Sequence, residues 1–403
     1  MMTSSNNYDV IIAGAGPAGT SAAIHLATGG ARVLLVEQKK FPREKLCGEF
    51  ISPECLKHFQ RLGVSDRMLD AGGKCLTQTV FYARSGRSID VPSSWFDNDN
   101  AALGLSRAEM DQRLLERART AGVIVLEETQ ASGLISEQRR IRGVQLKSQG
   151  GANEATAYVV IDATGRTRAL DHRLEASRNE TRKRRPLPRR ASLVAFKAHL
   201  RDALPLPGTC EIYFYPGGYG GLSGIEKGLS NLCFIVSAKD VRACQADPER
   251  AMRELVTKNS RASSSLAHAR VEGQWLAVAL ESFGRREPVP AEGLLMIGDA
   301  AAFIDPFTGS GMLMALEGGA LAANVILSHL PDLRNGGSCP ELAHDYRRLY
   351  RQHFGSRLRI CALLRRAAFV PSLADAAIRL FGTSDRVRRT LVRATRTRAK
   401  DEG

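Results

Sequence analysis

A glycine-rich turn near the start of the chain is the feature that most constrains its fold. An apolar run from Val10 to Ala13 leads directly into Gly14-Ala15-Gly16-Pro17-Ala18-Gly19. Such a run bounded by a turn is typical of a buried strand in a parallel sheet. In this spacing the first glycine permits a tight turn, the second lets a pyrophosphate approach the backbone, and the third lets the next helix pack closely on the strand. The turn therefore predicts a dinucleotide site.

A carboxylate at the end of the next apolar run strengthens this prediction. The run Arg32-Val-Leu-Leu-Val-Glu37 follows a predicted helix, and Glu37 lies 23 positions after Gly14. A spacing of roughly 20 residues places an acid on the ribose hydroxyls of a dinucleotide. Gln38, directly after the strand, is assigned to the same site. On these residues alone, a glycine-rich turn in an α/β protein that binds no nucleotide is the alternative.

The segment after Glu37 is predicted to be a loop beside the ligand, up to a helix that begins at Ser52-Pro53. In this loop Arg43 and Lys45 can meet phosphate, and Cys47-Gly48 can approach a ring. Cys47 is therefore a candidate both for cofactor binding and for catalysis. The alternative is that Cys47 is only a small, buried, apolar residue.

A second helix start places an arginine near the same ligand. Ser106 and Glu109 have the spacing of a capping box, which predicts that a helix begins here. Arg107 then lies in the first turn of that helix. It is either a surface charge or a contact to the phosphate and ribityl groups of the ligand.

From Ala191 onward, consecutive strands replace the alternation of strands and helices. Three strand-like runs are Ser192 to Leu200, Cys210 to Tyr215 and Asn231 to Val236. Such a change of pattern predicts a second domain built on an antiparallel sheet. Tyr219, in a glycine-rich turn between two of these strands, is a candidate catalytic residue on the substrate side and equally a packing residue.

A further ligand-type turn lies near residue 300. An apolar run ends in Gly298-Asp299, and a carboxylate at the end of a buried strand can accept hydrogen bonds from a sugar alcohol. A helix is then predicted to open on a glycine, where backbone N–H groups can face a developing negative charge. The turn and the helix start contribute Pro306, Gly309, Gly311 and Met312.

Composition limits the class of protein. The chain has 403 residues, 43% of them hydrophobic, which is ordinary for a globular protein of about two domains. Its net charge of +15 accompanies no helix-turn-helix, RNA-binding or zinc-finger pattern, so we expect no nucleic-acid partner. The eight cysteines contain no C-x-x-C pair and the histidines are scattered, which predicts free thiols and no metal site.

The ends of the chain bear on its location. The first residues are polar, and no apolar stretch reaches the roughly 18 residues that a membrane span needs, which predicts a cytoplasmic protein. The last part of the chain is predicted to be helical and contains many arginines. A basic amphipathic tail can lie peripherally on the inner face of a membrane, or it can pack on its own protein.

Three stretches in this order resemble FAD-dependent oxidoreductases of the glutathione-reductase-like FAD fold. The branch is the one shared by flavin monooxygenases, flavin halogenases and geranylgeranyl reductases. The stretches are the glycine turn with Glu37, Asp162-Ala-Thr-Gly165-Arg166, and Gly298-Asp299 with Pro306 and Gly309-Ser-Gly311-Met312. The resemblance implies FAD as the cofactor, with Glu37 on the adenosine ribose and Asp299 on the ribityl chain. It also implies that Gly311 and Met312 lie at the pyrimidine edge of the flavin, and Arg107 matches the arginine that opens a helix in that group.

The resemblance also implies the domain organisation of an α/β protein. A Rossmann-like FAD-binding domain would comprise residues 1–75, 100–180 and 285–330. A second, mainly antiparallel-sheet substrate domain would comprise residues 76–99 and 181–284. Residues 331–403 would form a helical C-terminal region.

The subfamily is read from shorter segments. Leu46-Cys47-Gly48-Glu49 looks like the Cys-Gly segment of geranylgeranyl reductases, whereas the segment from Pro216 to Gly224 keeps only the Pro and Tyr of their P-x-x-Y-x-W-x-F-P motif. The halogenase segment G-W-x-W-x-I-P is absent. Flavin monooxygenases usually have Asp-Gly where this chain has Thr164-Gly165.

We therefore predict an FAD-dependent oxidoreductase that acts on a small lipophilic substrate. The main prediction is a monooxygenase that uses NAD(P)H to hydroxylate an aromatic or polyketide-like compound. The alternative is a geranylgeranyl-reductase-like flavin reductase or dehydrogenase acting on carbon–carbon double bonds of an isoprenoid or lipid. Two other classes stay open: a flavin-free protein that binds a partner or prenyl chain, and a membrane-surface enzyme fed from the bilayer.

Overall fold

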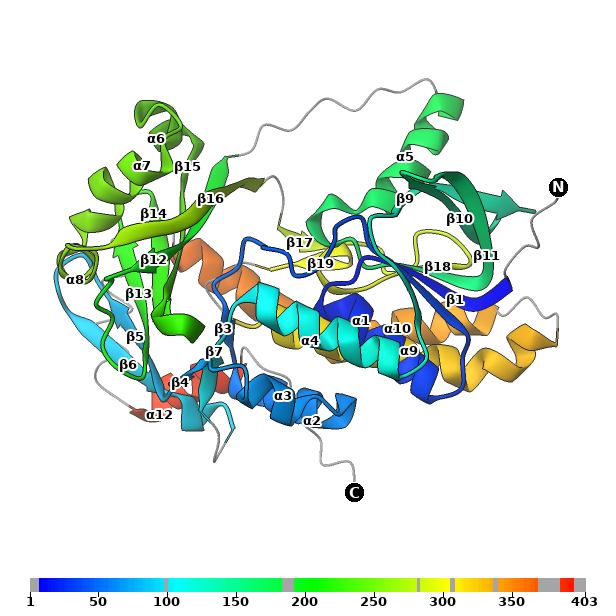
Figure 1. Cartoon of the computed structure of the whole chain (residues 1–403), viewed down its shortest axis with the longest axis horizontal. Coiled ribbons are helices and arrows are strands. Elements are labelled where there is room, and N and C mark those ends of the chain that lie inside the picture. Colours follow the sequence, from blue (N-terminus) through cyan, green and yellow to red (C-terminus); the bar gives the residue numbers. More distant parts are fainter. Residues whose placement is uncertain are drawn as a thin grey trace.

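The fold is taken from a computed structural model of the chain. It describes residues 7–97, 101–182, 192–280, 283–304, 309–335, 340–368 and 385–394. Figure 1 shows two sheet-based parts side by side, with long helices running beneath one of them. The α/β class and the mainly antiparallel second sheet are as predicted.

The first sheet contains the glycine turn and has seven strands. Its parallel part joins β8, β2, β1, β11 and β18, and β10 and β9 continue the sheet as antiparallel strands. Its strands are β1 (Asn7–Ala13), β2 (Val33–Val36), β8 (Ile124–Leu126), β9 (Gln130–Glu137), β10 (Arg140–Ser148), β11 (Gly151–Asp162) and β18 (Leu294–Met296). The apolar run Val123–Leu126 predicts a short buried strand from the sequence, and this prediction is wrong, because β8 is an edge strand and Ile124 is 41% exposed.

Helices cover both faces of this sheet. On one face the main apolar core packs α1 (Pro17–Thr28), α2 (Pro53–Leu62), α4 (Arg107–Thr120), α9 (Gly311–Arg334) and α10 (Pro340–Ala368). On the other face a smaller core includes Leu170 and Leu174 of α5 (Ala169–Arg182). The sequence predicts that α2 ends at Gly63, and it does. Gly63 adopts the left-handed conformation (φ +70°) that terminates a helix without steric cost. The short α3 (Ser65–Leu69) follows it.

α1 and α9 lie in close contact and run in the same direction. A Cβ on Gly319 would lie 2.6 Å from the carbonyl oxygen of Ala18, so only a glycine permits this approach. Ser21 Oγ donates to the carbonyl of Leu316 at 2.9 Å, and further along Gly29 lies against Leu327. Because contacting residues advance together along both helices, the two N-termini lie at the same end. The starts of α1 and α9 thus face the same region of the protein.

The second sheet has seven strands in the order β16-β12-β15-β14-β13-β5-β6, of which only β13 and β5 pair in parallel. Its strands are β5 (Gln78–Tyr82), β6 (Ser88–Pro92), β12 (Leu193–Arg201), β13 (Thr209–Tyr215), β14 (Gly218–Gly224), β15 (Ser230–Ser237) and β16 (Arg270–Leu280). One face buries an apolar core that includes residues of α7 (Pro248–Glu254) and α8 (Ser260–Ser265), which follow α6 (Ala238–Ala243). The sequence from Pro248 to Lys258 predicts one helix, but α7 ends at Glu254 and a 3₁₀ turn occupies Val256–Lys258.

Smaller elements connect the two parts. One small sheet joins β3 (Phe50–Ile51), β7 (Ala102–Gly104) and β4 (Lys74–Leu76), and a second joins β17 (Gly284–Arg285) to β19 (Ala302–Phe303). Short 3₁₀ turns lie at Ser93–Trp95, Gly165–Thr167, Glu226–Gly228 and Gly298–Ala300. The domain boundaries given above stay a prediction. The basic, proline-containing sequence of residues 181–190 predicts a domain crossing or surface loop, and most of it lies outside the described residues.

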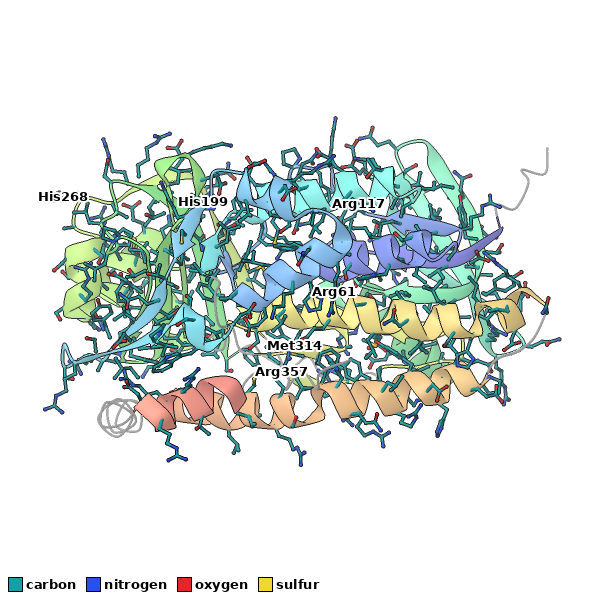
Figure 2. All side chains as sticks on the ribbon, turned by 90° about the horizontal axis from the view of Figure 1, so that it is seen from below. Arg61, Arg117, His199, His268, Met314 and Arg357 are labelled. Carbon is teal, nitrogen blue, oxygen red and sulfur yellow. The ribbon has the colours of Figure 1, made fainter. Side chains whose placement is uncertain are left out.

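The C-terminal region is helical, as predicted. α10 packs against α9, the two helices run side by side in Figure 2, and α12 (Asp385–Ala394) follows. Within the described ranges, α9 is long and apolar enough to cross a membrane, but 56% of its apolar window is buried inside the protein. Its packing on α1 is that of a core helix. A cytoplasmic location and a peripheral membrane contact both stay predictions.

Candidate cofactor and substrate site

The three glycines of the first turn do different work. Gly14 has φ +104°, and a Cβ there would lie 2.4 Å from the carbonyl oxygen of Ala163. A Cβ on Gly19 would lie 1.9 Å from the carbonyl oxygen of Gly14. Both glycines are therefore required for close backbone packing. A Cβ on Gly16, in contrast, would meet nothing nearer than Arg107 Nη2 at 3.9 Å, so Gly16 borders open space at the start of α1.

Glu37 is buried at the carboxyl end of β2 and braces the turn. Its Oε2 accepts a hydrogen bond from the backbone N–H of Ala15 at 3.0 Å, and its Oε1 accepts from the N–H of Lys39 at 3.1 Å. Arg43 Nη2 lies 3.4 Å from Oε2. Oε1, which accepts only one of these hydrogen bonds, keeps a lone pair for a ribose hydroxyl. Gln38, next to it, is exposed.

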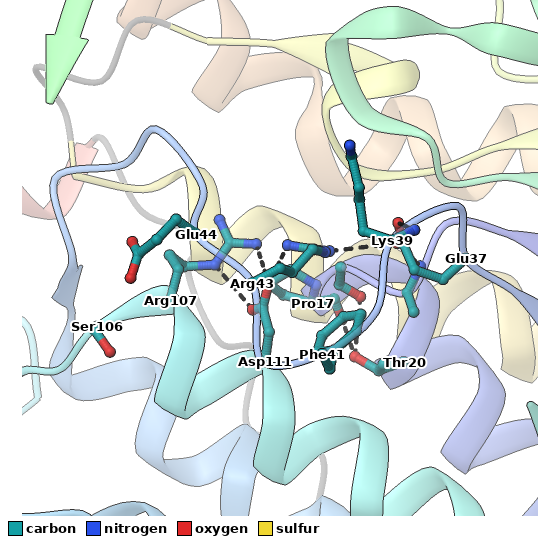
Figure 3. A network of polar contacts seen from close by, with 12 residues as sticks. Pro17, Thr20, Glu37, Lys39, Phe41, Arg43, Glu44, Ser106, Arg107 and Asp111 are labelled. Carbon is teal, nitrogen blue, oxygen red and sulfur yellow. Dashed lines mark hydrogen bonds and ion pairs between the residues drawn. The ribbon is translucent and has the colours of Figure 1, made fainter. Parts of the chain in front are cut away.

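Arg107 belongs to a buried network of charges and is not a surface charge. Its side chain is 12% exposed, and it donates to Asp111 from Nε at 2.9 Å and from Nη2 at 2.7 Å. Asp111 also accepts from Arg43 Nη1 at 3.0 Å, which links the network to Glu37 (Figure 3). Burial alone would lower the pKa of Arg107, but the charge and hydrogen bonds of Asp111 outweigh it and raise that pKa. Arg107 therefore holds a permanent positive charge beside Gly16.

The helix that carries Arg107 is capped differently from the prediction. Ser106 Oγ accepts from the N–H of Glu109 at 3.2 Å, as a capping box requires. The reciprocal bond is made by another residue, since Glu226 Oε2 accepts from the N–H of Ser106 at 3.0 Å. The side chain of Glu109 pairs with Arg113 instead. A residue of the second part of the chain thus completes the cap.

The late turn lies against the start of α1. Gly298 has φ +57°, and a Cβ there would lie 2.8 Å from the Cβ of Ala18, which brings Asp299 beside the glycine turn. Burial raises the pKa of Asp299, and the charges of Arg166 and Arg107 act against that rise. Asp299 and Arg107 therefore lie close enough for their charges to interact.

The helix start that follows is open on one side. Gly309 has φ +60°, a conformation that favours glycine, and a Cβ on Gly311 would meet nothing within 4 Å. Met312 is half-buried and packs against the main core. Pro306 lies outside the described residues.

These features fit one extended dinucleotide. The N-termini of α1 and α9 lie at the same end, and each borders open space at a glycine, Gly16 and Gly311. Aligned helix N-termini favour anions and electron-rich groups. Arg107 adds a fixed positive charge beside Gly16, while Glu37 and Asp299 supply acceptors for hydroxyl groups at two separate positions. A cofactor such as FAD, which carries a pyrophosphate, two polyhydroxy chains and a ring that becomes anionic, matches this set of groups.

The Cys47 segment lies between the cofactor site and the second sheet. Cys47 is half-buried with its side chain near Arg107, and its carbonyl accepts from Asn231 Nδ2 of β15 at 3.1 Å. Burial, and then the nearby Cys47, raise the pKa of the Cys233 thiol on β15 to about 12. Gly48 is exposed, with open space at its Cα. The seven cysteines within the described residues are all free thiols, as predicted.

A second buried network was not predicted from the sequence. Glu49, fully buried with φ +53°, accepts from Lys197 Nζ at 2.7 Å, and its other oxygen lies 2.7 Å from His199 Nε2. Lys197 Nζ also donates to Glu44 at 2.5 Å, and Glu49 accepts from the N–H of Arg107 at 2.9 Å. Burial would raise the pKa of Glu49, but the hydrogen bond from His199 and the charge of Lys197 lower it overall. The alternation of Lys197 and His199 along one strand was the only available signal.

This network resembles a metal site in its ligand types but already contains a cation. Ligand atoms of Glu44, Glu49 and His199 lie within 4.8 Å of one another. The ammonium group of Lys197 donates to both carboxylates and is only 2% exposed. Burial lowers the pKa of Lys197, but Glu49 and Glu44 outweigh it and raise that pKa. The ammonium group of Lys197 therefore takes the place that a metal ion would have between the two carboxylates.

The rest of the facing sheet surface is apolar. Tyr219 is 5% exposed, stands opposite Phe214 and Ile235 in the ladder, and belongs to an apolar cluster that also contacts Leu46 and Phe303 from the first part. Its surroundings are those of a packing residue at the edge of a lipophilic surface. Cys47 and Glu49 therefore lie where a charged network meets an apolar one.

The fold and the paired helix starts define a dinucleotide-binding protein of the flavoprotein type. The sequence model described as "FAD binding domain" matches residues 7–331, so the chain belongs to that family of FAD-binding proteins. It is an enzyme of the FAD-dependent oxidoreductase class, as the sequence predicted.

Individual relatives narrow the comparison. A digeranylgeranylglycerophospholipid reductase of Methanosarcina mazei is 28% identical over 328 residues, covering 79% of this chain and 74% of the relative. Among solved structures, the flavin-dependent brominase Bmp2 superposes with a TM-score of 0.79 and 20% identity, covering 97% of this chain and 93% of that one. A geranylgeranyl bacteriochlorophyll reductase-like protein of Thermoplasma acidophilum gives 0.72 and 22%, covering 97% and 92%. The two structural similarities concern the fold.

Proposed function

We propose that the protein is an FAD-dependent reductase that saturates carbon–carbon double bonds of an isoprenoid or lipid chain. The observation that carries this proposal is the position of Leu46-Cys47-Gly48-Glu49. In this segment Glu49 accepts from the backbone N–H of Arg107 at 2.9 Å, and Leu46 packs against the apolar surface of the second sheet. The similarity to a digeranylgeranylglycerophospholipid reductase supports the same reading over most of the chain.

The residues present assign a role to each part of the cofactor site. Glu37 would hold the adenosine ribose, the N–H groups at the start of α1 the pyrophosphate, and Asp299 the ribityl chain. The start of α9 at Gly311 and Met312 would face the ring. The bound flavin supplies the hydride for such a reduction. Arg107 and the Cys47 segment orient the substrate edge of this site, and the apolar cluster around Tyr219 excludes water from it.

Three finer assignments belong to the proposal. NAD(P)H is the proposed electron donor. The substrate is lipophilic, and its exact class is left open by the loss of the Trp, Phe and last Pro from the segment Pro216 to Gly224. A peripheral membrane contact through the C-terminal helices would give access to such a substrate.

The test is a reaction without oxygen. The FAD-loaded protein is reduced and mixed with polyprenyl lipids, and flavin absorbance is followed together with the mass of the lipid. We expect the flavin to be reoxidised as the lipid gains one pair of hydrogen atoms per double bond. A protein that takes up no FAD, or a reduced flavin that no polyprenyl lipid reoxidises, would contradict the proposal.

Hydroxylation of an aromatic or polyketide-like compound is the competing proposal. Admitting oxygen to the reduced enzyme separates the two, because a hydroxylase forms a transient flavin–oxygen adduct that is visible by rapid-scan absorbance. Its absence in the presence of lipophilic aromatic compounds would remove the hydroxylase reading.

A further inference from the structure

A chain of ionisable groups runs from the protein surface to the sheet face that the Cys47 segment covers. It begins at Glu44, whose side chain is 46% exposed, and continues through Lys197, which is 2% exposed. Lys197 donates to Glu49 Oε1, and Glu49 Oε2 lies 2.7 Å from His199 Nε2. Each link is within hydrogen-bonding distance, so a proton can pass along the chain by successive transfers.

This chain of ionisable groups buries more charge than is needed to hold two parts of a protein together. Taking Lys197 and Glu49 out of water costs several kcal/mol for each ion, and well-packed apolar residues often replace such a pair without loss of stability. Glu49 also holds φ +53°, a conformation that disfavours residues other than glycine. Strained backbone and buried charge at one position are typical of functional sites.

The inner end of the chain presents unused polar groups to one face of the sheet. Among the described residues, no partner contacts His199 Nδ1. Asn231 stands directly opposite His199 on β15, and its Oδ1 is buried with no hydrogen-bond partner. The Nδ2 of the same amide holds the carbonyl of Cys47. A free imidazole nitrogen and a free amide oxygen thus lie beside the Cys47 segment.

Among the described residues, the side-chain hydrogen bonding of His199 is confined to this chain of ionisable groups. On β16 its ladder partner is Glu272, which pairs with Arg201. On β12 Lys197 lies two residues before it, and on β15 its ladder partner is Asn231. From the first part of the protein it contacts Glu49 Oε2, and Glu49 Oε1 accepts from the N–H of Arg107.

We propose that His199 is the residue that gives the substrate its proton, and that Glu49, Lys197 and Glu44 return a proton to it from water. This rests on the proposed reduction of a carbon–carbon double bond. One carbon receives the hydride that the reduced cofactor supplies. The electron pair of the double bond takes a proton from His199 Nδ1 and forms the second C–H bond. His199 keeps the proton on Nε2 when it gives up the one on Nδ1. A turn of the ring then brings the bare nitrogen to Glu49, which supplies a proton taken up from water through Glu44 and Lys197, while Asn231 Oδ1 orients the imidazole or a polar group of the substrate.

The first test removes the imidazole. We expect His199→Ala to bind FAD as the wild type does and to reduce polyprenyl lipid in a single turnover about 100-fold more slowly, the usual size of a general-acid contribution. Added free imidazole should restore much of the rate, because it can occupy the vacated space. The matched control is His268→Ala, an exposed histidine at the outer end of the same part (Figure 2), which should behave as wild type. A wild-type rate in His199→Ala would overturn the proposal.

A second variant tests whether the loss of rate comes from misfolding. His199→Gln keeps an N–H that can donate to Glu49, so its thermal unfolding and FAD content should match the wild type. We expect the same loss of rate with no rescue by imidazole. Slow turnover in His199→Ala that imidazole does not restore, with folding intact, would show a merely structural role and overturn the proposal.

A readout without turnover tests the route itself. In FAD-loaded protein carrying ¹⁵N-labelled histidine rings, nuclear magnetic resonance reports how fast the His199 N–H exchanges with water. Lys197→Gln keeps a donor to both glutamates but has no proton to pass on, so exchange should slow. Unchanged exchange would overturn the route. If the wild type reduces no polyprenyl lipid, the proposed function fails, and this measurement still decides whether the chain carries protons.

Discussion

Two of the buried charge networks in the described part of the protein differ in the charged groups they contain and in how far they extend. The cofactor-side network consists of Glu37, Arg43, Arg107 and Asp111, and the substrate-side network consists of Glu44, Glu49, Lys197 and His199. The first pairs two carboxylates with two guanidinium groups and lies within the first part of the protein. The second joins both parts, and its amine and imidazole exchange protons readily, whereas guanidinium does not. The first is therefore suited to hold a fixed charge pattern and the second to move a proton.

The largest effect should come from breaking the cofactor-side network at its centre. Asp111 is fully buried and accepts from both arginines. Asp111→Ala would leave the buried Arg107 without its carboxylate and Arg43 with only the longer contact to Glu37, which costs about 3–5 kcal/mol of unfolding free energy. Urea denaturation of the FAD-free protein measures this. The control is Glu116→Ala on the same helix, where a half-exposed side chain should cost about 0.5 kcal/mol. Equal stability of the two variants would contradict the network as drawn.

A smaller change should separate cofactor binding from stability. Gly16→Ala adds a Cβ that touches no protein atom within 3.9 Å, so the unfolding free energy of the FAD-free protein should change little. The same Cβ would occupy space assigned to the pyrophosphate, and we expect FAD affinity to fall about 100-fold, or about 2.7 kcal/mol. Titration of FAD-free protein with FAD gives the value. Unaltered affinity would place the pyrophosphate elsewhere.

The difference between the two networks also explains which features of the protein could be predicted from its sequence. Gly14, Gly19 and Glu37 are set by local backbone geometry, and their spacing carries the prediction of turn and strand. The two-sheet architecture followed from strand patterns in the same way. The substrate-side network joins Glu49 to Lys197 and His199, about 150 positions away, and no local pattern encodes such a distance. The completion of the helix cap by Glu226 was missed for the same reason.

The substrate-side network should reveal itself through pH. The pKa of Glu49 is lowered in the folded protein, so its contribution to stability is present above the unfolded value of about 4.3 and is lost as the pH falls through the folded pKa. Glu49→Gln lacks this contribution. We expect it to be about 2 kcal/mol less stable than wild type at pH 7, because removing a charge from a buried hydrogen-bonded pair is costly. The gap should narrow in acid, as urea denaturation at several pH values would show; a gap independent of pH would contradict the ionised state of Glu49.

The smallest effect on stability should come from Glu44, and it gives the sharpest distinction between the networks. Its side chain is 46% exposed, so the pair with Lys197 is worth about 1 kcal/mol or less. Glu44→Gln should therefore unfold nearly as the wild type does. It removes the water-facing carboxylate of the chain, however, so proton exchange at His199 should slow as it does in Lys197→Gln. The control is Glu272→Gln, which removes a carboxylate opposite His199 that is outside the chain and should leave exchange unchanged. Equal exchange in both variants would mean that water reaches His199 by another way, and that the substrate-side network, like the cofactor-side one, holds its charges in place without moving protons.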